Sequence, residues 1–108
     1  MRKLFLALAI FAMYLGWTKW HHAAGAGKQY AALHTEKVVL YATSWCGYCA
    51  KTRQFLTQND IPYFEYDIEK SEEGQDQFEE LGGRGVPLVL VKGQPIFGYN
   101  PDAIREKL

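Results

Sequence analysis

Residues 38–49 read VVLYATSWCGYC, and this stretch decides how the rest of the chain is interpreted. It begins with a β-branched and aromatic run of the kind found in a strand that is buried on both faces. It ends with Cys46 and Cys49, the only two cysteines of the 108 residues, at the point where the strand gives way to a predicted helix. A cysteine pair with two intervening residues at a strand-to-helix junction is typical of proteins that form and break disulfides.

The two cysteines are predicted to have different tasks. A cysteine at the start of a helix lies among unpaired backbone N–H groups and the positive end of the helix dipole, and both stabilise a thiolate. We therefore expect Cys46 to be the nucleophile, with the lower pKa and the greater exposure. Cys49 follows almost one turn later on the same helix face, where its sulfur reaches that of Cys46 and closes a small ring. Cys49 is thus the expected resolving cysteine, and the pair cycles between dithiol and disulfide.

Two other interpretations of the pair stay open, each with less support. Half of a zinc site needs further ligands, but His21, His22 and His34 all lie far upstream in a low-complexity stretch, and we expect no metal. A purely structural disulfide would close a loop over two intervening residues. So short a loop removes little entropy from the unfolded chain.

The composition indicates one small domain with a segment in front of it. Twelve basic residues balance twelve acidic ones, which argues against nucleic acid as a partner. Residues 4–17 (LFLALAIFAMYLGW) carry no charge and follow Arg2 and Lys3. We interpret residues 1–20 as an N-terminal signal anchor or a cleaved signal peptide. A buried first helix of the domain is a third interpretation, with less support because the segment is apolar all round.

The anchor and the signal peptide both predict export of the domain. The basic residues before the apolar segment favour a cytoplasmic N-terminus, although Lys19 and Lys28 on the far side dilute this bias. The expected location is the inner membrane of a bacterial-type cell, or secretion, with the domain facing the periplasm. Residues 21–36 mix small and polar types without sustained periodicity and are interpreted as a linker. Residues 37–108 are then the folded domain.

Elements of the domain follow in the order strand, helix, strand, helix, strand, strand, helix, which is β-α-β-α-β-β-α. Their predicted ranges are 38–42, 46–59, 63–68, 71–81, 86–91, 95–98 and 100–108. The first strand-helix-strand unit demands a right-handed crossover and hence parallel pairing. The step Lys92-Gly93-Gln94 between two apolar runs predicts a hairpin turn.

This order resembles the thioredoxin fold, and in its compactness it is similar to the glutaredoxin family. The resemblance covers residues 37–108 and rests on Cys46-Gly47-Tyr48-Cys49, Gly85-Val86-Pro87 and the Gly98 segment before the last helix. It implies an α/β domain with a mixed four-stranded sheet. It also implies a cis Pro87 against the active-site cysteines, with the backbone of Val86 open to an incoming cysteine peptide.

Departures from the family concern the electron donor. Glutaredoxins that bind glutathione usually carry a lysine at the position of Thr43 and two aspartates where this chain has Pro101 and Asp102. The Gly-aromatic-x-Pro-Asp pattern that starts at Gly98 is similar to the NrdH-redoxins, which take electrons from thioredoxin reductase. The WCGYC motif is similar to the mycoredoxins, which use another low-molecular-weight thiol. We expect glutathione to be at best a weak partner, and the donor, glutathione or a reductase, stays open.

The resulting hypothesis is a thiol-disulfide oxidoreductase of glutaredoxin type, an enzyme with Cys46 and Cys49 as catalytic residues. Trp45, Tyr48, Val86 and Pro87 are its candidate substrate-binding residues. We expect a monomer that acts on protein or low-molecular-weight disulfides and needs no cofactor beyond its own redox-active disulfide. The alternative is a non-catalytic, membrane-tethered binding module with a structural disulfide. A reduction potential of about −180 to −270 mV would favour the enzyme.

Overall fold

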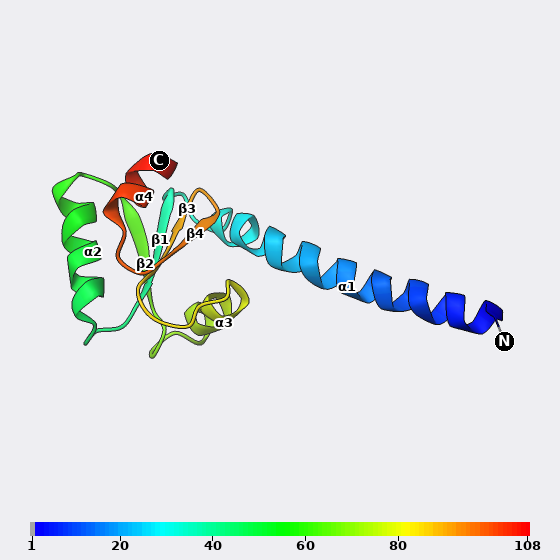
Figure 1. Cartoon of the computed structure of the whole chain (residues 1–108). Helices are drawn as coiled ribbons and strands as arrows, with labels where there is room; N and C mark the ends of the chain where they lie inside the picture. Colours follow the sequence, from blue (N-terminus) through cyan, green and yellow to red (C-terminus); the bar gives the residue numbers. More distant parts are fainter. Residues whose placement is uncertain (1) are drawn as a thin grey trace.

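A mixed four-stranded sheet forms the centre of the domain (Figure 1). The computed structural model describes residues 2–108, apart from the side chains of residues 2, 4 and 16–25. The spatial order of the strands is β2-β1-β3-β4. Their bounds are β1 (Val38–Ala42), β2 (Tyr63–Asp67), β3 (Leu88–Val91) and β4 (Gln94–Phe97).

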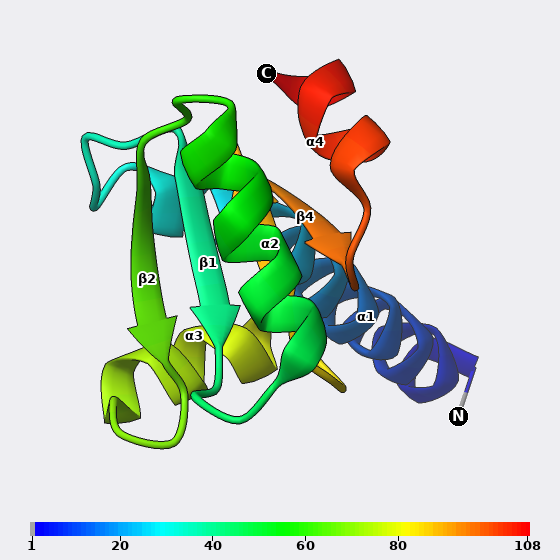
Figure 2. The same cartoon turned by 90° about the vertical axis from the view of Figure 1, so that its left-hand side faces the viewer.

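Helices cover both faces of this sheet (Figure 2). Their bounds are α1 (Arg2–Ala31), α2 (Gly47–Gln58), α3 (Glu72–Glu80) and α4 (Pro101–Lys107). The helices α2 and α4 pack on one face through Phe55, Leu56 and Ile104. On the other face α3 and the end of α1 pack against the alternate strand residues. Because β1 and β3 are covered on both sides, every residue of these two strands is buried.

The pairing of the strands confirms the predicted fold class. The strands β1 and β2 are parallel, with Leu40 opposite Glu65, as the crossover through α2 requires. The strand β3 runs antiparallel to β1, and β4 antiparallel to β3, so the sheet is mixed. Lys92 and Gly93 both have positive φ and form a two-residue hairpin turn whose twist matches the flanking strands.

The first helix differs from the predicted linker. Residues 21–31 continue α1 without a break, so an irregular segment is present only from residue 32 to residue 37. The end of α1 is also part of the domain's packing, because Ala26 is buried in the core cluster on the α3 face and Tyr30 packs against it. A mixture of alanine, glycine and polar residues is compatible with a helix as well as with a flexible linker. Here the burial of the end of α1 against the domain stabilises the helix.

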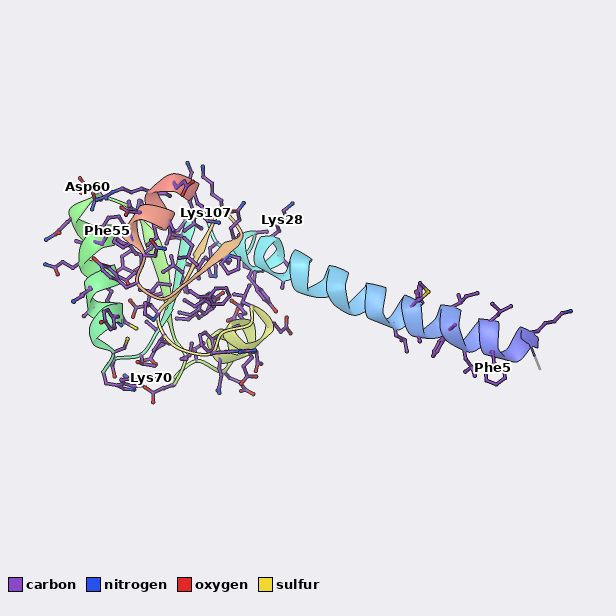
Figure 3. The ribbon with its side chains drawn as sticks, in the orientation of Figure 1. Phe5, Lys28, Phe55, Asp60, Lys70 and Lys107 are labelled. Atoms are coloured by element: carbon purple, nitrogen blue, oxygen red, sulfur yellow. The ribbon has the colours of Figure 1, made fainter. Side chains whose placement is uncertain are left out.

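The far part of α1 projects away from the domain, with Phe5 near its outer end (Figure 3). Seven of its large apolar side chains have exposed fractions of 59% to 76%; they are Phe5, Leu6, Leu8, Ile10, Phe11, Met13 and Tyr14. This stretch is therefore not a buried first helix of the domain. Within the described part of the chain, no helix has the length and apolarity that a membrane crossing requires. The predicted signal or anchor segment thus gains no support from the described residues.

Candidate functional site

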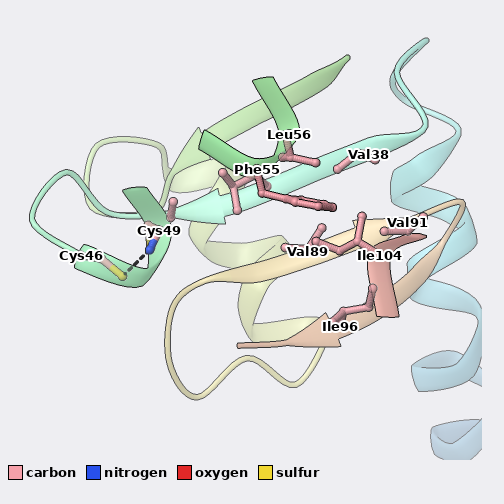
Figure 4. Packing of buried hydrophobic residues seen from close by; sticks show 11 residues of the cluster. Val38, Cys46, Cys49, Phe55, Leu56, Val89, Val91, Ile96 and Ile104 are labelled. Atoms are coloured by element: carbon pink, nitrogen blue, oxygen red, sulfur yellow. Dashed lines mark hydrogen bonds between the residues drawn. The ribbon is translucent and has the colours of Figure 1, made fainter. Parts of the chain in front are cut away.

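Cys46 and Cys49 lie at the start of α2, at the end of the sheet where β1 leaves it (Figure 4). Cys46 is the N-cap residue of the helix, with extended backbone angles, and its Sγ accepts a hydrogen bond of 3.1 Å from the backbone N–H of Cys49. Both cysteines are free thiols. The cap places the Cys46 sulfur at the unpaired N–H groups and positive dipole end of α2, which favour a negative charge there.

Burial separates the two thiols. Cys46 keeps 8% of its surface exposed, whereas Cys49 keeps none. The prediction that Cys46 is the more accessible thiol agrees with this order, although Cys46 is itself largely buried. Burial, followed by the hydrogen bond to Cys46, raises the pKa of the Cys49 thiol to about 12. The Cys49 thiol therefore keeps its proton near neutral pH as long as its surroundings stay as they are in this structure.

A cis peptide bond joins Val86 and Pro87 beside the cysteines, as the family resemblance implies. The thiol of Cys46 donates to the carbonyl oxygen of Val86 at 3.7 Å, so Cys46 and the residue before Pro87 are in contact. Pro87 is buried and Val86 is partly exposed. The structure thus brings Val86 and Pro87, which lie about 40 positions further along the sequence, to the Cys46 sulfur.

Exposed aromatic side chains lie on either side of Cys46 at the start of the helix. Trp45 is 71% exposed, and its indole N–H donates to Glu69 at 2.5 Å. Tyr48 is 60% exposed, and its ring stacks with that of Tyr99 at a centroid distance of 6.3 Å. Lys51 Nζ lies 5.1 Å from the Tyr48 ring centroid. These rings are available to a substrate because the domain's own packing does not cover them.

A shallow, mostly apolar cavity of about 350 Å³ adjoins Val86. It is lined by Gly82, Arg84, Gly85, Val86, Phe97 and Gly98. Sequence reasoning missed Phe97, which is 58% exposed at the end of β4. An exposed phenylalanine at the end of a strand looks like an ordinary strand residue until the hairpin brings it beside the segment that precedes Pro87.

Sequence reasoning also missed an ion pair that starts four residues after Cys49 on α2. Arg53 follows Cys49 by four residues on α2, and its guanidinium makes a bidentate pair with Glu65 of β2, with Nε–Oε1 at 2.7 Å and Nη2–Oε2 at 3.0 Å. Nη2 also donates to the carbonyl oxygen of Thr43 at 3.1 Å. The spacing of four from Cys49 was the available signal, since residues at that spacing share a helix face.

Metal-binding residues do not gather anywhere in the part of the chain that the structure describes, where no group of three or more His, Cys, Asp or Glu side chains is found. The site residues themselves offer two sulfurs and no further ligand in contact with them. The chemistry available at this site is that of a capped thiol and a buried thiol three residues apart.

Residues 38–96 of the sequence match the protein family described as Glutaredoxin. A protein of Mycobacterium tuberculosis named "Putative glutaredoxin Rv3198A" is 35% identical over 77 residues, which are 68% of this chain and 92% of the relative.

Solved structures agree with this match. The glutaredoxin of Archaeoglobus fulgidus superposes with a TM-score of 0.59 at 26% identity, covering 69% of this chain and 88% of its own. The glutaredoxin-like protein NrdH-redoxin of Escherichia coli shares the fold with a TM-score of 0.59 at 19% identity, covering 64% of this chain and 91% of its own.

Proposed function

This chain belongs to the glutaredoxin family of thiol redox proteins, and from that membership we propose that it is a thiol-disulfide oxidoreductase whose reactive group is Cys46. The observation that carries the proposal is the hydrogen bond from the Cys49 N–H to Cys46 Sγ at the N-terminus of α2. A sulfur in this position is stabilised as a thiolate, and the Cys49 sulfur lies three residues on, where it can complete a disulfide exchange.

The exchange runs in two steps. The thiolate of Cys46 attacks one sulfur of a substrate disulfide, the substrate S–S bond breaks, and the released thiolate takes up a proton. Cys49 then loses its proton and attacks Cys46 Sγ, which breaks the mixed disulfide and releases the second substrate thiol. The protein is oxidised by two electrons to the Cys46–Cys49 disulfide, and the substrate is reduced by two. The same steps in reverse oxidise a dithiol.

Substrate recognition is assigned in this proposal to the surroundings of Cys46. An extended peptide that carries the substrate cysteine would run along the backbone at Val86 and Pro87, with the exposed rings of Trp45 and Tyr48 beside it. The cavity of about 350 Å³ next to Val86 would take the side chain that neighbours this cysteine. Its apolar lining, with Phe97, favours an apolar residue there.

The first experiment tests the reaction itself. Redox titration should give a two-electron potential of about −180 to −270 mV, and the reduced protein should reduce a peptide disulfide. Cys46→Ser should abolish this activity, while Cys49→Ser should stop it at the mixed disulfide. A far more negative potential, with no transfer to the peptide, would identify a structural disulfide and the non-catalytic binding module instead.

Glutathione is proposed to be a weak electron donor for this protein. Thr43, at the position of the family's lysine, is only 3% exposed and has its side chain inside the domain. Pro101, at the position of the family's first aspartate, is the first residue of α4 and carries no charge. Neither residue offers a charge to the tripeptide. Losing two charge-assisted hydrogen bonds of about 1.5–3 kcal/mol each would weaken binding at least a hundredfold.

A charge restored at α4 tests this proposal. Pro101→Asp adds the missing carboxylate at the first position of the helix, where the dipole favours it. It should raise the rate with a glutathione mixed disulfide roughly tenfold, with Pro101→Ala as the uncharged control. Strong glutathione-dependent turnover by the wild type, unimproved by the aspartate, would show that the charges come from elsewhere.

The location of the domain is a further proposal, on separate observations. The outer part of α1 exposes a series of large apolar side chains to solvent, which is unfavourable unless something covers them. We propose that this segment brings the domain to a membrane and that the domain lies outside the cytoplasm. A reporter that is active only in the periplasm, fused after Leu108, should be active. Activity of a cytoplasm-dependent reporter in its place would reverse the assignment.

A further inference from the structure

The ion pair of Arg53 and Glu65 joins α2 to the edge strand β2. Arg53 is held by three hydrogen bonds, two to the Glu65 carboxylate and one to the Thr43 carbonyl oxygen. Both side chains are less than a third exposed, at 28% and 29%. A guanidinium fixed at this many points has one orientation, and its charge acts on its surroundings from a fixed place.

Cys49 precedes Arg53 by four residues on α2, so the two side chains share one face of the helix and the Arg53 charge acts on this thiol. Arg53 lowers the pKa of Cys49, as does the backbone N–H of Thr43, against the larger opposing effect of burial. Cys46 also acts on Cys49 from α2, through a hydrogen bond and through its charge, and both raise its pKa. On β2, Glu65 and Tyr63 face Arg53 and raise the pKa of its guanidinium.

The mixed disulfide changes this balance. Once Cys46 is bonded to the substrate it carries neither a proton nor a charge, so its two effects on Cys49 disappear. Burial still opposes the Cys49 thiolate, while the cation of Arg53 and the N–H of Thr43 still favour it. Resolution requires this thiolate, because the thiol is not the nucleophile.

We propose that Arg53 is a positioning residue for the resolving step and that Glu65 moderates it, so that the pair sets how readily Cys49 gives up its proton once Cys46 is in a mixed disulfide. The inference rests on the proposed exchange reaction. In this step the Cys49 proton passes to water, the Cys49 sulfur bonds to Cys46 Sγ, and the substrate sulfur leaves as a thiolate with the electron pair of the broken bond.

Opposite signs are expected from the two halves of the pair. Arg53→Gln removes the cation and leaves the Glu65 carboxylate, so Cys49 should deprotonate at higher pH. Glu65→Gln leaves the cation unpaired, so Cys49 should deprotonate at lower pH. Both substitutions break the same bidentate contact. A merely structural role of the pair would therefore move both variants in the same direction.

Stopped-flow reaction of the reduced full-length protein with 5,5′-dithiobis(2-nitrobenzoate) separates the steps. The first equivalent of coloured thiolate reports attack by Cys46 and depends on reagent concentration. The second reports resolution by Cys49 and does not. We expect Arg53→Gln to raise the pH midpoint of the second phase by roughly 0.5–1 pH units and Glu65→Gln to lower it by a similar amount. At neutral pH the second phase should slow roughly three- to tenfold in the first variant and accelerate in the other.

Arg53→Lys is the matched variant, because it keeps the charge and loses the bidentate contact; its midpoint should lie closer to the wild type than that of Arg53→Gln. The first phase shows in every variant that α2 still presents a reactive Cys46. Midpoints that move together in Arg53→Gln and Glu65→Gln, or that do not move, would overturn the inference and leave the exchange reaction standing. A wild type that releases one equivalent and never the second would overturn the proposed function and this inference with it.

Discussion

Two residues of the same type differ here because their neighbours differ. Both belong to one core cluster, but Cys46 caps α2, touches the Val86 carbonyl and keeps 8% of its surface exposed, whereas Cys49 keeps none. Burial raises the pKa of the Cys49 thiol to about 12. The order of events in the proposed exchange follows from this difference, because the thiol that attacks first must be the one that a substrate can reach.

Alkylation of the reduced protein tests this order. With limiting iodoacetamide near neutral pH, Cys46 should carry nearly all of the label, because Cys49 has no exposed surface and a pKa raised to about 12. Peptide mapping by mass spectrometry gives the ratio. Cys49→Ser should trap mixed disulfides with partners and Cys46→Ser few. Preferential labelling of Cys49 would reverse the two roles.

Thr43 carries the only buried side-chain oxygen or nitrogen that lacks a hydrogen-bond partner among the described residues. Replacing this hydroxyl by a methyl group of similar size should remove a desolvation cost. We expect Thr43→Val to raise the free energy of unfolding by about 1 kcal/mol. Urea denaturation measures it.

Thr52→Val is the matched control for this substitution. Thr52 is also fully buried, but its hydroxyl donates to the Tyr48 carbonyl oxygen at 2.8 Å. Its replacement should lower the free energy of unfolding by about 1 kcal/mol. Destabilisation by both substitutions to the same extent would mean that the Thr43 hydroxyl has a partner in solution.

At the scale of elements, α1 is attached to the domain through a close backbone contact. Gly27 of α1 lies against Gly93 in the β3–β4 turn, so closely that a Cβ on Gly27 would stand 2.0 Å from the Gly93 carbonyl oxygen. Gly93 has a φ of +84°, which suits glycine in this turn. Two glycines from segments far apart in the sequence therefore allow the helix to cross the hairpin.

Gly27→Ala should release this contact. Alanine favours the helix itself by about 1 kcal/mol, but the overlap with backbone atoms cannot be relieved by a side-chain rotation. We expect faster amide hydrogen exchange in residues 26–31 and a loss of about 1–3 kcal/mol of unfolding free energy. Gln29→Ala, at an exposed position of the same turn, controls for helix propensity. Unchanged exchange in Gly27→Ala would mean that α1 does not rest on the hairpin.

Predictability from sequence also differs between elements. The strands, α2, α3 and α4 were predicted within two residues because local signals mark their ends: Ser71 caps α3 through the Gly74 N–H, and Gly82 with a φ of +84° follows its last turn. The end of α1 was missed because no local signal marks it. Its helical state depends on packing against α3 and the β3–β4 hairpin. The residue pattern within the segment carries no information about that packing.

At the scale of the whole molecule, the sheet and the place of the two cysteines at the start of α2 could be predicted from the sequence, but the Arg53–Glu65 ion pair could not. Alternation and turn residues are local, so the order of elements and the parallel β1–β2 pair could be derived from them. The Arg53–Glu65 pair joins α2 to β2 across the sheet edge, and charged residues at such spacings are common on any surface. Only the register of the strands shows which charge meets which.

The extent of the folded domain is the last question that the whole molecule poses. From the sequence, the folded domain was predicted to begin at Lys37. In the structure, Ala26, Tyr30 and Ala31 pack on the cluster formed by β1, β3 and α3, and the Tyr30 hydroxyl donates to Glu80. Burying part of one tyrosine and two alanines contributes about 1–3 kcal/mol. A protein that begins at residue 24 should therefore unfold at higher urea than one that begins at Lys37, by that difference in free energy. Tyr30→Ala in the longer protein should remove most of this difference. Equal stabilities of the two would return the boundary to Lys37 and make the last turn of α1 part of the connecting segment.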